Sequence, residues 1–153
     1  MSIVWNQVEK ALHPDGSLRD IYFFDSTVEI WDSFLAAVFK SEFNYKFYKD
    51  GEACEIYTDL NSILKERENT TLMLVIEKDG VSFNCHFFTD EEIELDITPR
   101  EVNSQYSLNV VLEFMVHFSR AIGLPCVLTY EGSPEHVIIK CSNEAGMGPI
   151  VVT

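Results

Sequence analysis

Apolar and polar residues alternate in short runs along most of this chain. The clearest run is residues 92–97, where Ile93, Leu95 and Ile97 alternate with acidic side chains, as in a strand with one buried and one exposed face. Similar runs, each bounded by turn-forming residues, predict strands over 19–24, 44–48, 54–57, 71–77, 81–88, 126–130 and 136–141, with a short edge piece at 150–152. The pattern therefore predicts about seven to nine strands, a usual number for one open sheet.

The turns between these runs favour antiparallel pairing. Asp50-Gly51 and Asp79-Gly80 each stand between two strand-like runs, and Asp-Gly tolerates the positive φ angles of a tight hairpin turn. Gly132 and Pro134 mark a further reversal. Neighbouring strands are thus expected to form hairpins.

Two segments show helical rather than strand periodicity. Ser26 and Glu29 fit a capping box, with the Ser26 hydroxyl on the third amide of the helix and Glu29 bonding back. After this box, apolar residues follow at helical spacing: Ile30, Trp31, Phe34, Leu35 and Val38.

The second predicted helix is longer and more apolar. Thr98 and Glu101 form another capping box with Pro99 in the first turn, so the helix is expected to start there. Gly123 and Pro125 end it. The polar segment 61–69 fits either a loop or a short helix.

These elements predict an α+β fold in one domain covering residues 1–153. We expect a mostly antiparallel sheet with two main helices packed chiefly on one face. Both 19–57 and 92–141 show the order strand, helix, strand, strand. This order fits either two β-α-β-β halves from a duplication or a common way of folding such chains.

Charge narrows the range of partners. The chain has 153 residues with 25 acidic and 11 basic side chains, a formal net charge of −14, yet 46% of its residues are hydrophobic. An apolar content of this size supports a core, so the acidity is not that of a disordered tail. We expect no nucleic-acid partner and no anionic membrane, because both repel such a surface, and we expect a basic protein partner instead.

The cysteines indicate a compartment. Cys54, Cys85, Cys126 and Cys141 lie within or beside predicted strands and form no Cys-x-x-Cys pair. We expect reduced, buried thiols and a cytoplasmic protein, with two disulfides as the alternative. No secretory signal or membrane-spanning run is apparent in the sequence.

The densest charge lies in residues 90–96, five of which are acidic. One interpretation is a solvated strand face that protects a sheet edge from aggregation. The functional hypothesis is a face for a basic partner made by Glu91, Glu92, Glu94 and Asp96, with Tyr22 and Tyr48 as aromatic anchors. The run lacks the Gly and Asn spacing of a calcium loop, so no metal and no cofactor are predicted.

No sequence motif specifies a reaction. Phosphate-binding loops, dinucleotide fingerprints, His-Glu-x-x-His and Gly-x-Ser-x-Gly are all absent from the sequence. Cys85 and His86 are adjacent in a strand and so point to opposite faces. The enzymatic or small-ligand alternative is a pocket between the sheet and the long helix that uses His86 and His136. A homodimer without chemistry is a third interpretation.

Three stretches resemble a known kind of protein. They are residues 14–22 (Pro-Asp-Gly-Ser-Leu-Arg-Asp-Ile-Tyr), 84–88 (Asn-Cys-His-Phe-Phe), and Glu94-Leu95-Asp96 with Pro99-Arg100-Glu101. Together they resemble small acidic bacterial proteins of uncharacterised function, some of the immunity type found beside secreted toxins. The resemblance implies a bacterial, cytoplasmic protein and a toxin as the basic partner; it supplies no site residues.

Overall fold

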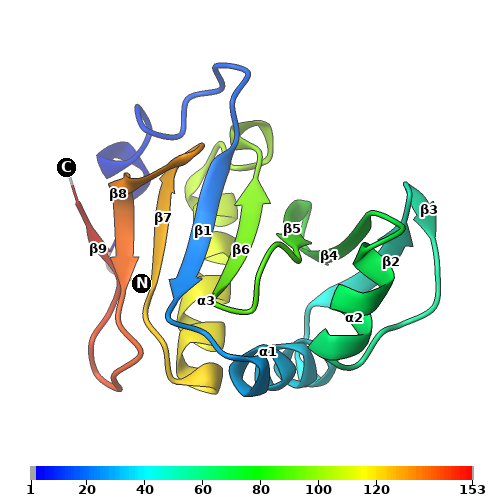
Figure 1. The fold of residues 1–153 in the computed structure, drawn as a ribbon. Coiled ribbons are helices and arrows are strands. Elements are labelled where there is room, and N and C mark those ends of the chain that lie inside the picture. Colours follow the sequence, from blue (N-terminus) through cyan, green and yellow to red (C-terminus); the bar gives the residue numbers. More distant parts are fainter. Residues whose placement is uncertain (1–2, 153) are drawn as a thin grey trace.

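One antiparallel sheet organises the computed structural model, which describes residues 3–152 (Figure 1). Its strands are β1 (Arg19–Phe24), β2 (Asn44–Lys49), β3 (Glu52–Ala53), β4 (Leu72–Lys78), β5 (Val81–His86), β6 (Glu92–Ile97), β7 (Cys126–Tyr130), β8 (Ser133–Cys141) and β9 (Ile150–Val151). The helices are α1 (Val28–Lys40), α2 (Leu60–Arg67) and α3 (Gln105–Ile122), with 3₁₀ turns η1 (Trp5–Gln7) and η2 (Pro99–Glu101). The predicted α+β class is confirmed.

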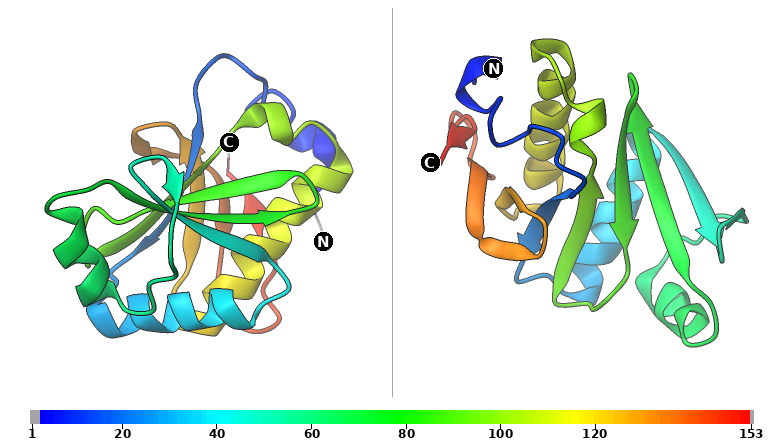
Figure 2. Two further views of the ribbon diagram at one scale, coloured as in Figure 1. Left: turned by 90° about the vertical axis from the view of Figure 1, so that its right-hand side faces the viewer. Right: turned by 90° about the horizontal axis from the view of Figure 1, so that it is seen from above.

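The strand order is β3-β2-β4-β5-β6-β1-β7-β8-β9. Both predicted halves show the order strand, helix, strand, strand. Their paths in the sheet differ, because α1 leads from β1 past three strands to β2, whereas α3 leads from β6 past β1 alone to β7. Figure 2 shows that α1 and α3 cross rather than run parallel.

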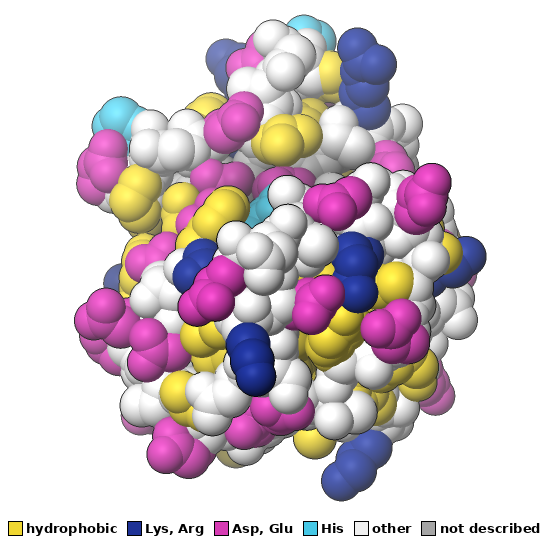
Figure 3. Space-filling model, turned by 45° about the vertical axis from the view of Figure 1, so that its right-hand side comes forward, with side chains coloured by type: hydrophobic (Ala, Val, Ile, Leu, Met, Phe, Trp, Pro, Cys, Tyr) yellow, Lys and Arg dark blue, Asp and Glu magenta, His cyan; other side chains and the backbone are white. Residues whose placement is uncertain are grey.

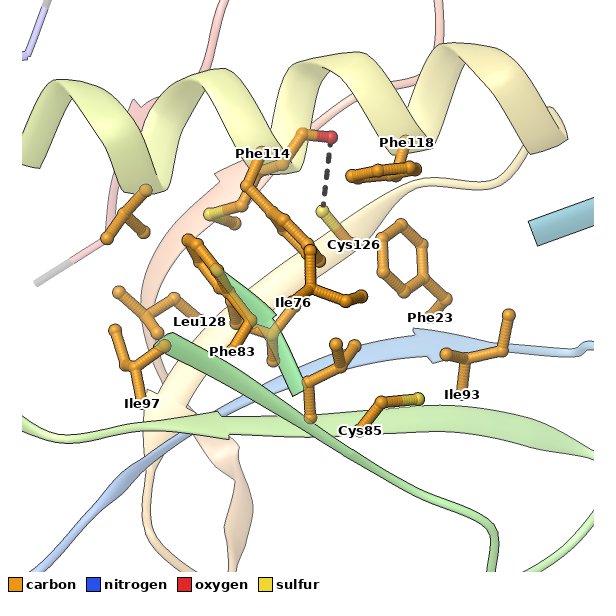
Figure 4. Close-up of a cluster of buried hydrophobic side chains, with 14 of the residues drawn as sticks. Phe23, Ile76, Phe83, Cys85, Ile93, Ile97, Phe114, Phe118, Cys126 and Leu128 are labelled. Carbon is orange, nitrogen blue, oxygen red and sulfur yellow. Dashed lines mark hydrogen bonds between the residues drawn. The ribbon is translucent and has the colours of Figure 1, made fainter. Parts of the chain in front are cut away.

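The core lies between the sheet and these two helices. Phe114 of α3 stacks on Phe83 of β5 with ring centroids 4.0 Å apart, and Phe118 of α3 packs against Phe34 of α1 (Figure 4). The strands contribute their inward residues, such as Ile93, Leu95 and Ile97, all fully buried as the alternation predicted. The opposite side chains of the strands therefore form a face that α1 and α3 do not cover.

Two predicted hairpin turns are confirmed in detail. Asp50 and Gly51 have φ angles of 50° and 83°, and Asp79 and Gly80 have φ angles of 50° and 84°. Two successive positive φ angles are the signature of the type I′ turn, whose twist matches that of the flanking strands.

The predicted helix starts were wrong in detail. Thr27, not Ser26, caps α1 by accepting a hydrogen bond from the Ile30 amide at 3.2 Å. The long helix starts at Gln105, because residues 99–101 form only a 3₁₀ turn and the Glu101 carboxylate accepts from the Ser82 amide at 2.9 Å instead of bonding back. Ser104 then provides a new cap, and the helix ends at Gly123 as predicted.

The strand predicted over 54–57 was also wrong. The pairing of β2 with β3 ends at Ala53, and the Cys54 amide makes one last backbone bond to Phe47. The chain then turns away to α2, and the Tyr57 ring packs beside Phe47 at 5.8 Å. Helix α2 covers most of the polar segment 61–69, for which the sequence allowed either a loop or a short helix.

Candidate functional site

The uncovered face of the sheet brings polar residues from several strands into cross-strand rows. Strand register places Tyr48, Met73, His86, Glu94 and Tyr22 in one row. The adjacent row contains Lys46, Val75, Asn84, Asp96 and Asp20. Residues directly opposite on antiparallel strands are close enough for their side chains to interact. The middle of the sheet, at β5, β6 and β1, therefore holds three carboxyl groups beside one imidazole.

An imidazole–carboxylate pair is the shortest contact in this cluster. The His86 Nε2 and Asp96 Oδ2 atoms are 2.6 Å apart, and the Asn84 amide donates to Asp96 Oδ1 at 2.9 Å. The pKa of His86 is raised, chiefly by its hydrogen bond to Asp96, against the opposing effect of burial. The exposed Phe88 ring stacks on His86 with centroids 5.3 Å apart. Both carboxylate oxygens of Asp96 therefore already have hydrogen-bond partners within the sheet, His86 and Asn84.

Asp20 is enclosed on the next strand. Its Oδ2 accepts from the Gly132 amide at 2.9 Å and from the Tyr22 hydroxyl at 3.2 Å. Burial raises the pKa of Asp20, with Asp96 contributing further, although the two hydrogen bonds act in the opposite direction. Burial also raises the pKa of Tyr22, so its hydroxyl stays protonated and donates.

Glu94 is the least compensated carboxyl of the cluster. It is half-buried between Tyr22 and His86 in the strand register. Burial, followed by the charges of Asp20 and Glu92, raises its pKa to about 7, and His86 offsets only part of this effect. Near neutral pH the carboxyl is therefore poised between its charged and neutral forms.

No lysine or arginine among residues 3–152 forms an ion pair with Asp20, Glu91, Glu92, Glu94 or Asp96. Lys49 pairs with Glu55 and Glu66, and Lys78 with Glu42 and Glu113, away from the cluster. Figure 3 shows acidic side chains gathered around a recessed imidazole near the centre of the view, with lysine or arginine among the acids below it. The cluster is negative even though the surface around it is mixed.

Two hollows flank the cluster, and each contains one of the predicted tyrosines. Tyr48 lines a hollow of about 360 Å³ together with Met73, Val75 and His86. Tyr22 lines a hollow of about 550 Å³ with Phe24, Val127 and Lys140. A partner could therefore place charge on the cluster and apolar side chains on either side of it.

The structure brings most of the predicted site residues together. Glu92, Glu94 and Asp96 share one face of β6, and Tyr22 and Tyr48 lie in the row that contains Glu94. Glu91 lies outside β6, on the exposed turn before it, where its carbonyl accepts from the Ser26 amide. Asp96, at 9% exposed, is too enclosed to be a free docking group.

Sequence reasoning missed Asp20 and gave His86 a different role. The spacing of Asp20 and Tyr22 places both on one strand face, but only the pairing of β1 with β6 brings Asp20 beside Asp96. His86 and His136 do not share a site, because β6, β1 and β7 separate their strands and they line different hollows. Cys85 is buried on the core face, opposite His86, as expected.

Within residues 3–152, no three His, Cys, Asp or Glu side chains are grouped so that they could hold a metal ion. Over the same residues, no helix has both the length and the apolarity needed to cross a bilayer. No protein-family model, curated protein or solved structure matches this chain. The inference about function therefore depends on the geometry of the acidic face.

Proposed function

We propose that this chain is a non-catalytic binding protein whose acidic sheet face engages a basic protein, as an immunity or inhibitor protein does. The observation that carries the proposal is Glu94, a half-buried carboxyl with a pKa raised to about 7 and no lysine or arginine paired with it among the described residues. A carboxyl in this position costs folding stability whenever it is charged. A cationic side chain of a partner would remove that cost.

The surroundings of Glu94 support a protein partner rather than a free cation. Hollows lined by Tyr22 and Tyr48 lie on its two sides, and tyrosines are common anchors at protein interfaces. The net charge of −14 would speed the approach of a basic protein over a long range. Three stretches resemble small acidic bacterial proteins, some of which are of the toxin-immunity type, and this resemblance suggests a toxin as that partner.

The test compares two variants with the same change in charge. In Glu92→Gln/Glu94→Gln, two carboxyls of the face are neutralised; in Glu9→Gln/Glu68→Gln, two exposed carboxyls elsewhere are neutralised. Each tagged protein is used for affinity capture from its native host at low and high salt. We expect a basic protein to be captured by the wild type and the Glu9/Glu68 variant at low salt, and to be lost with the Glu92/Glu94 variant.

The association rate then tests whether the acidic face attracts the partner electrostatically. With the captured protein purified, the Glu92/Glu94 variant is expected to associate more slowly and with a weaker dependence on salt than the Glu9/Glu68 variant. Equal rates for the two variants would contradict the proposed face. A captured protein that is acidic, or a second copy of the chain detected by gel filtration, would contradict the proposed partner.

A further inference from the structure

We propose that Cys126 and Cys141 are a peroxide-responsive dithiol that closes to a disulfide within one hairpin. The two residues are direct partners in the antiparallel pairing of β7 with β8. The Cα atoms of opposed residues in such a ladder are about 4.5–5.5 Å apart, within the range that a disulfide spans. This inference is independent of the proposed binding function.

The side chains of the pair are both buried on the same side of the sheet. Cys126 points toward α3 (Figure 4), and its Sγ accepts a hydrogen bond from the Ser119 hydroxyl at 3.2 Å. The Cys126 thiol donates to the Met115 carbonyl at 3.7 Å and the Cys141 thiol to the Ser142 carbonyl at 3.7 Å, and the two thiols are close enough to shift each other's pKa. All four cysteines are free thiols in the structure, so the pair is present in its reduced form.

The two sulfurs differ in reactivity. Interaction with the Cys126 thiol lowers the pKa of Cys141 to about 7 against the opposing effect of burial, with smaller contributions from Ser119 and Arg120, whereas burial raises the pKa of Cys126. Thiolate is the nucleophilic form of cysteine, so Cys141 reacts first and Cys126 resolves. Burial instead raises the pKa of Cys85 well above its usual value, and the register pairs Cys85 with Leu74 and Leu95 rather than with another cysteine.

The surroundings favour a small, uncharged oxidant. Cys126 and Cys141 are 2% and 1% exposed, and both line the hollow of about 550 Å³ that opens beside Tyr22. A net charge of −14 repels anionic disulfides of the glutathione class. Hydrogen peroxide is neutral and is small enough to enter the hollow.

The reaction balances in two steps. The Cys141 thiolate attacks one oxygen of hydrogen peroxide and breaks the O–O bond, which gives a sulfenic acid and hydroxide; the proton lost by the thiol converts that hydroxide to water. The Cys126 sulfur then attacks the Cys141 sulfur, the S–S bond forms, and the sulfenic oxygen leaves as water with the Cys126 proton. Two thiols are oxidised while one peroxide is reduced to two waters.

The test uses the full-length, reduced protein treated with hydrogen peroxide and then alkylated under denaturing conditions. Trypsin cleaves after Arg120 and Lys140, so Cys126 and Cys141 fall in separate peptides, 121–140 and 141–153. We expect an intact mass lower by two hydrogens before alkylation, these two peptides linked, and alkylation confined to Cys54 and Cys85. Four alkylated cysteines, or stable sulfinic acid on Cys141 without the linked peptides, would overturn the proposal.

Two variants distinguish the roles within the pair. Cys126→Ser removes the resolving thiol, so peroxide is expected to leave a sulfenic acid on Cys141 that dimedone labels. Cys54→Ser is the matched control, and it should form the linked peptides as the wild type does. A link that involves Cys54 or Cys85 in the wild-type protein would contradict the assignment, and this measurement does not depend on how either variant folds.

Discussion

The His86 imidazole and the Asp96 carboxylate join β5 to β6 through a contact of 2.6 Å on the uncovered face of the sheet. Only three residue pairs connect these two strands, and two of them, Asn84 with Asp96 and His86 with Glu94, involve the acidic cluster. The short ladder lies between the β2-β4-β5 part of the sheet and the part around β1 and β6. Side-chain contacts thus reinforce the sheet where its backbone pairing is limited.

Replacing Asp96 by Asn should lower the pKa of His86. The hydrogen bond to Asp96 is the main reason that this pKa is raised above its ordinary value of 6.5. Without that bond, burial of the imidazole lowers the pKa. A titration of the His86 ring protons by NMR measures the change directly. Glu91→Gln is the control, because this exposed carboxyl lies on the turn before β6 and should leave the titration nearly unchanged. An unaltered His86 pKa in Asp96→Asn would exclude the proposed cause.

The same pair predicts how folding stability depends on pH. A histidine whose pKa is higher in the folded than in the unfolded state adds stability below pH 6.5, and this contribution is lost as pH rises through the folded pKa. Asp96→Asn should remove this decline, which we expect to be about 1 kcal/mol for a partly exposed pair. Urea unfolding of both proteins on either side of the transition measures it. A decline of equal size in the variant would contradict the linkage to Asp96.

Glu94→Gln should stabilise the protein at alkaline pH. The Glu94 carboxyl has a folded pKa of about 7 against an ordinary value of 4.5, so its ionisation destabilises the fold as pH rises between these values. Glutamine resembles the protonated form, so we expect a gain of about 1–3 kcal/mol above pH 7 and little difference below pH 4.5. Urea unfolding at both extremes measures the difference. The exposed Glu91→Gln change should give no such gain. A Glu94→Gln protein that is no more stable than wild type above pH 7 would show that ionisation of Glu94 does not destabilise the fold.

The alternation within single strands made the face of each side chain predictable from the sequence. Ile93 and Leu95 are buried while Glu92 and Glu94 are on the other side, because successive side chains in a strand point to opposite faces. Type I′ turns also followed from local chemistry, since Asp79 and Gly80 both accept positive φ angles. Features that depend on only a few neighbouring residues could thus be predicted from the sequence.

Contacts between strands that are distant in the sequence could not be predicted. Nothing local to Asp20 indicates that it lies opposite Asp96, because that depends on β1 pairing with β6 across more than sixty intervening residues. The start of the long helix was predicted several residues too early for a similar reason. The Glu101 carboxylate accepts a hydrogen bond from the distant Ser82 amide and does not cap its own helix. The acidic residues of β6 could therefore be predicted, whereas the His86 and Asp20 that complete the cluster required the sheet register.

Gly123→Ala should destabilise the C-terminal end of α3. Gly123 has a φ angle of 74°, and its amide donates to the Ser119 carbonyl at 2.9 Å to close the last turn. A Cβ at this position meets no atom within 4 Å, so the cost is conformational and about 1 kcal/mol. Thermal or urea unfolding measures it. Asn tolerates the left-handed region better than Ala, so Gly123→Asn should lose less stability; equal losses would point to a cause other than backbone conformation.

Arg19→Ala should be the most damaging of these changes. Arg19 is 1% exposed, and its guanidinium donates to the carbonyls of Ala11 (2.8 Å), His13 (3.3 Å) and Leu18 (3.0 Å), which holds the N-terminal segment against β1. Its removal deletes a fully buried side chain and leaves several partly buried carbonyls without their donor, so we expect a loss of about 3 kcal/mol in the free energy of unfolding.

Arg100→Ala provides the matched comparison for Arg19. Arg100 is exposed in the middle of η2, so its replacement should change the free energy of unfolding by less than about 0.5 kcal/mol in the same urea experiment. Hydrogen exchange adds a readout of location, because loss of the Arg19 contacts should first increase exchange in residues 8–18, before the sheet itself opens. If both variants lose the same small amount of stability, the N-terminal segment is held by its apolar residues, such as Val8 and Leu12, rather than by the guanidinium.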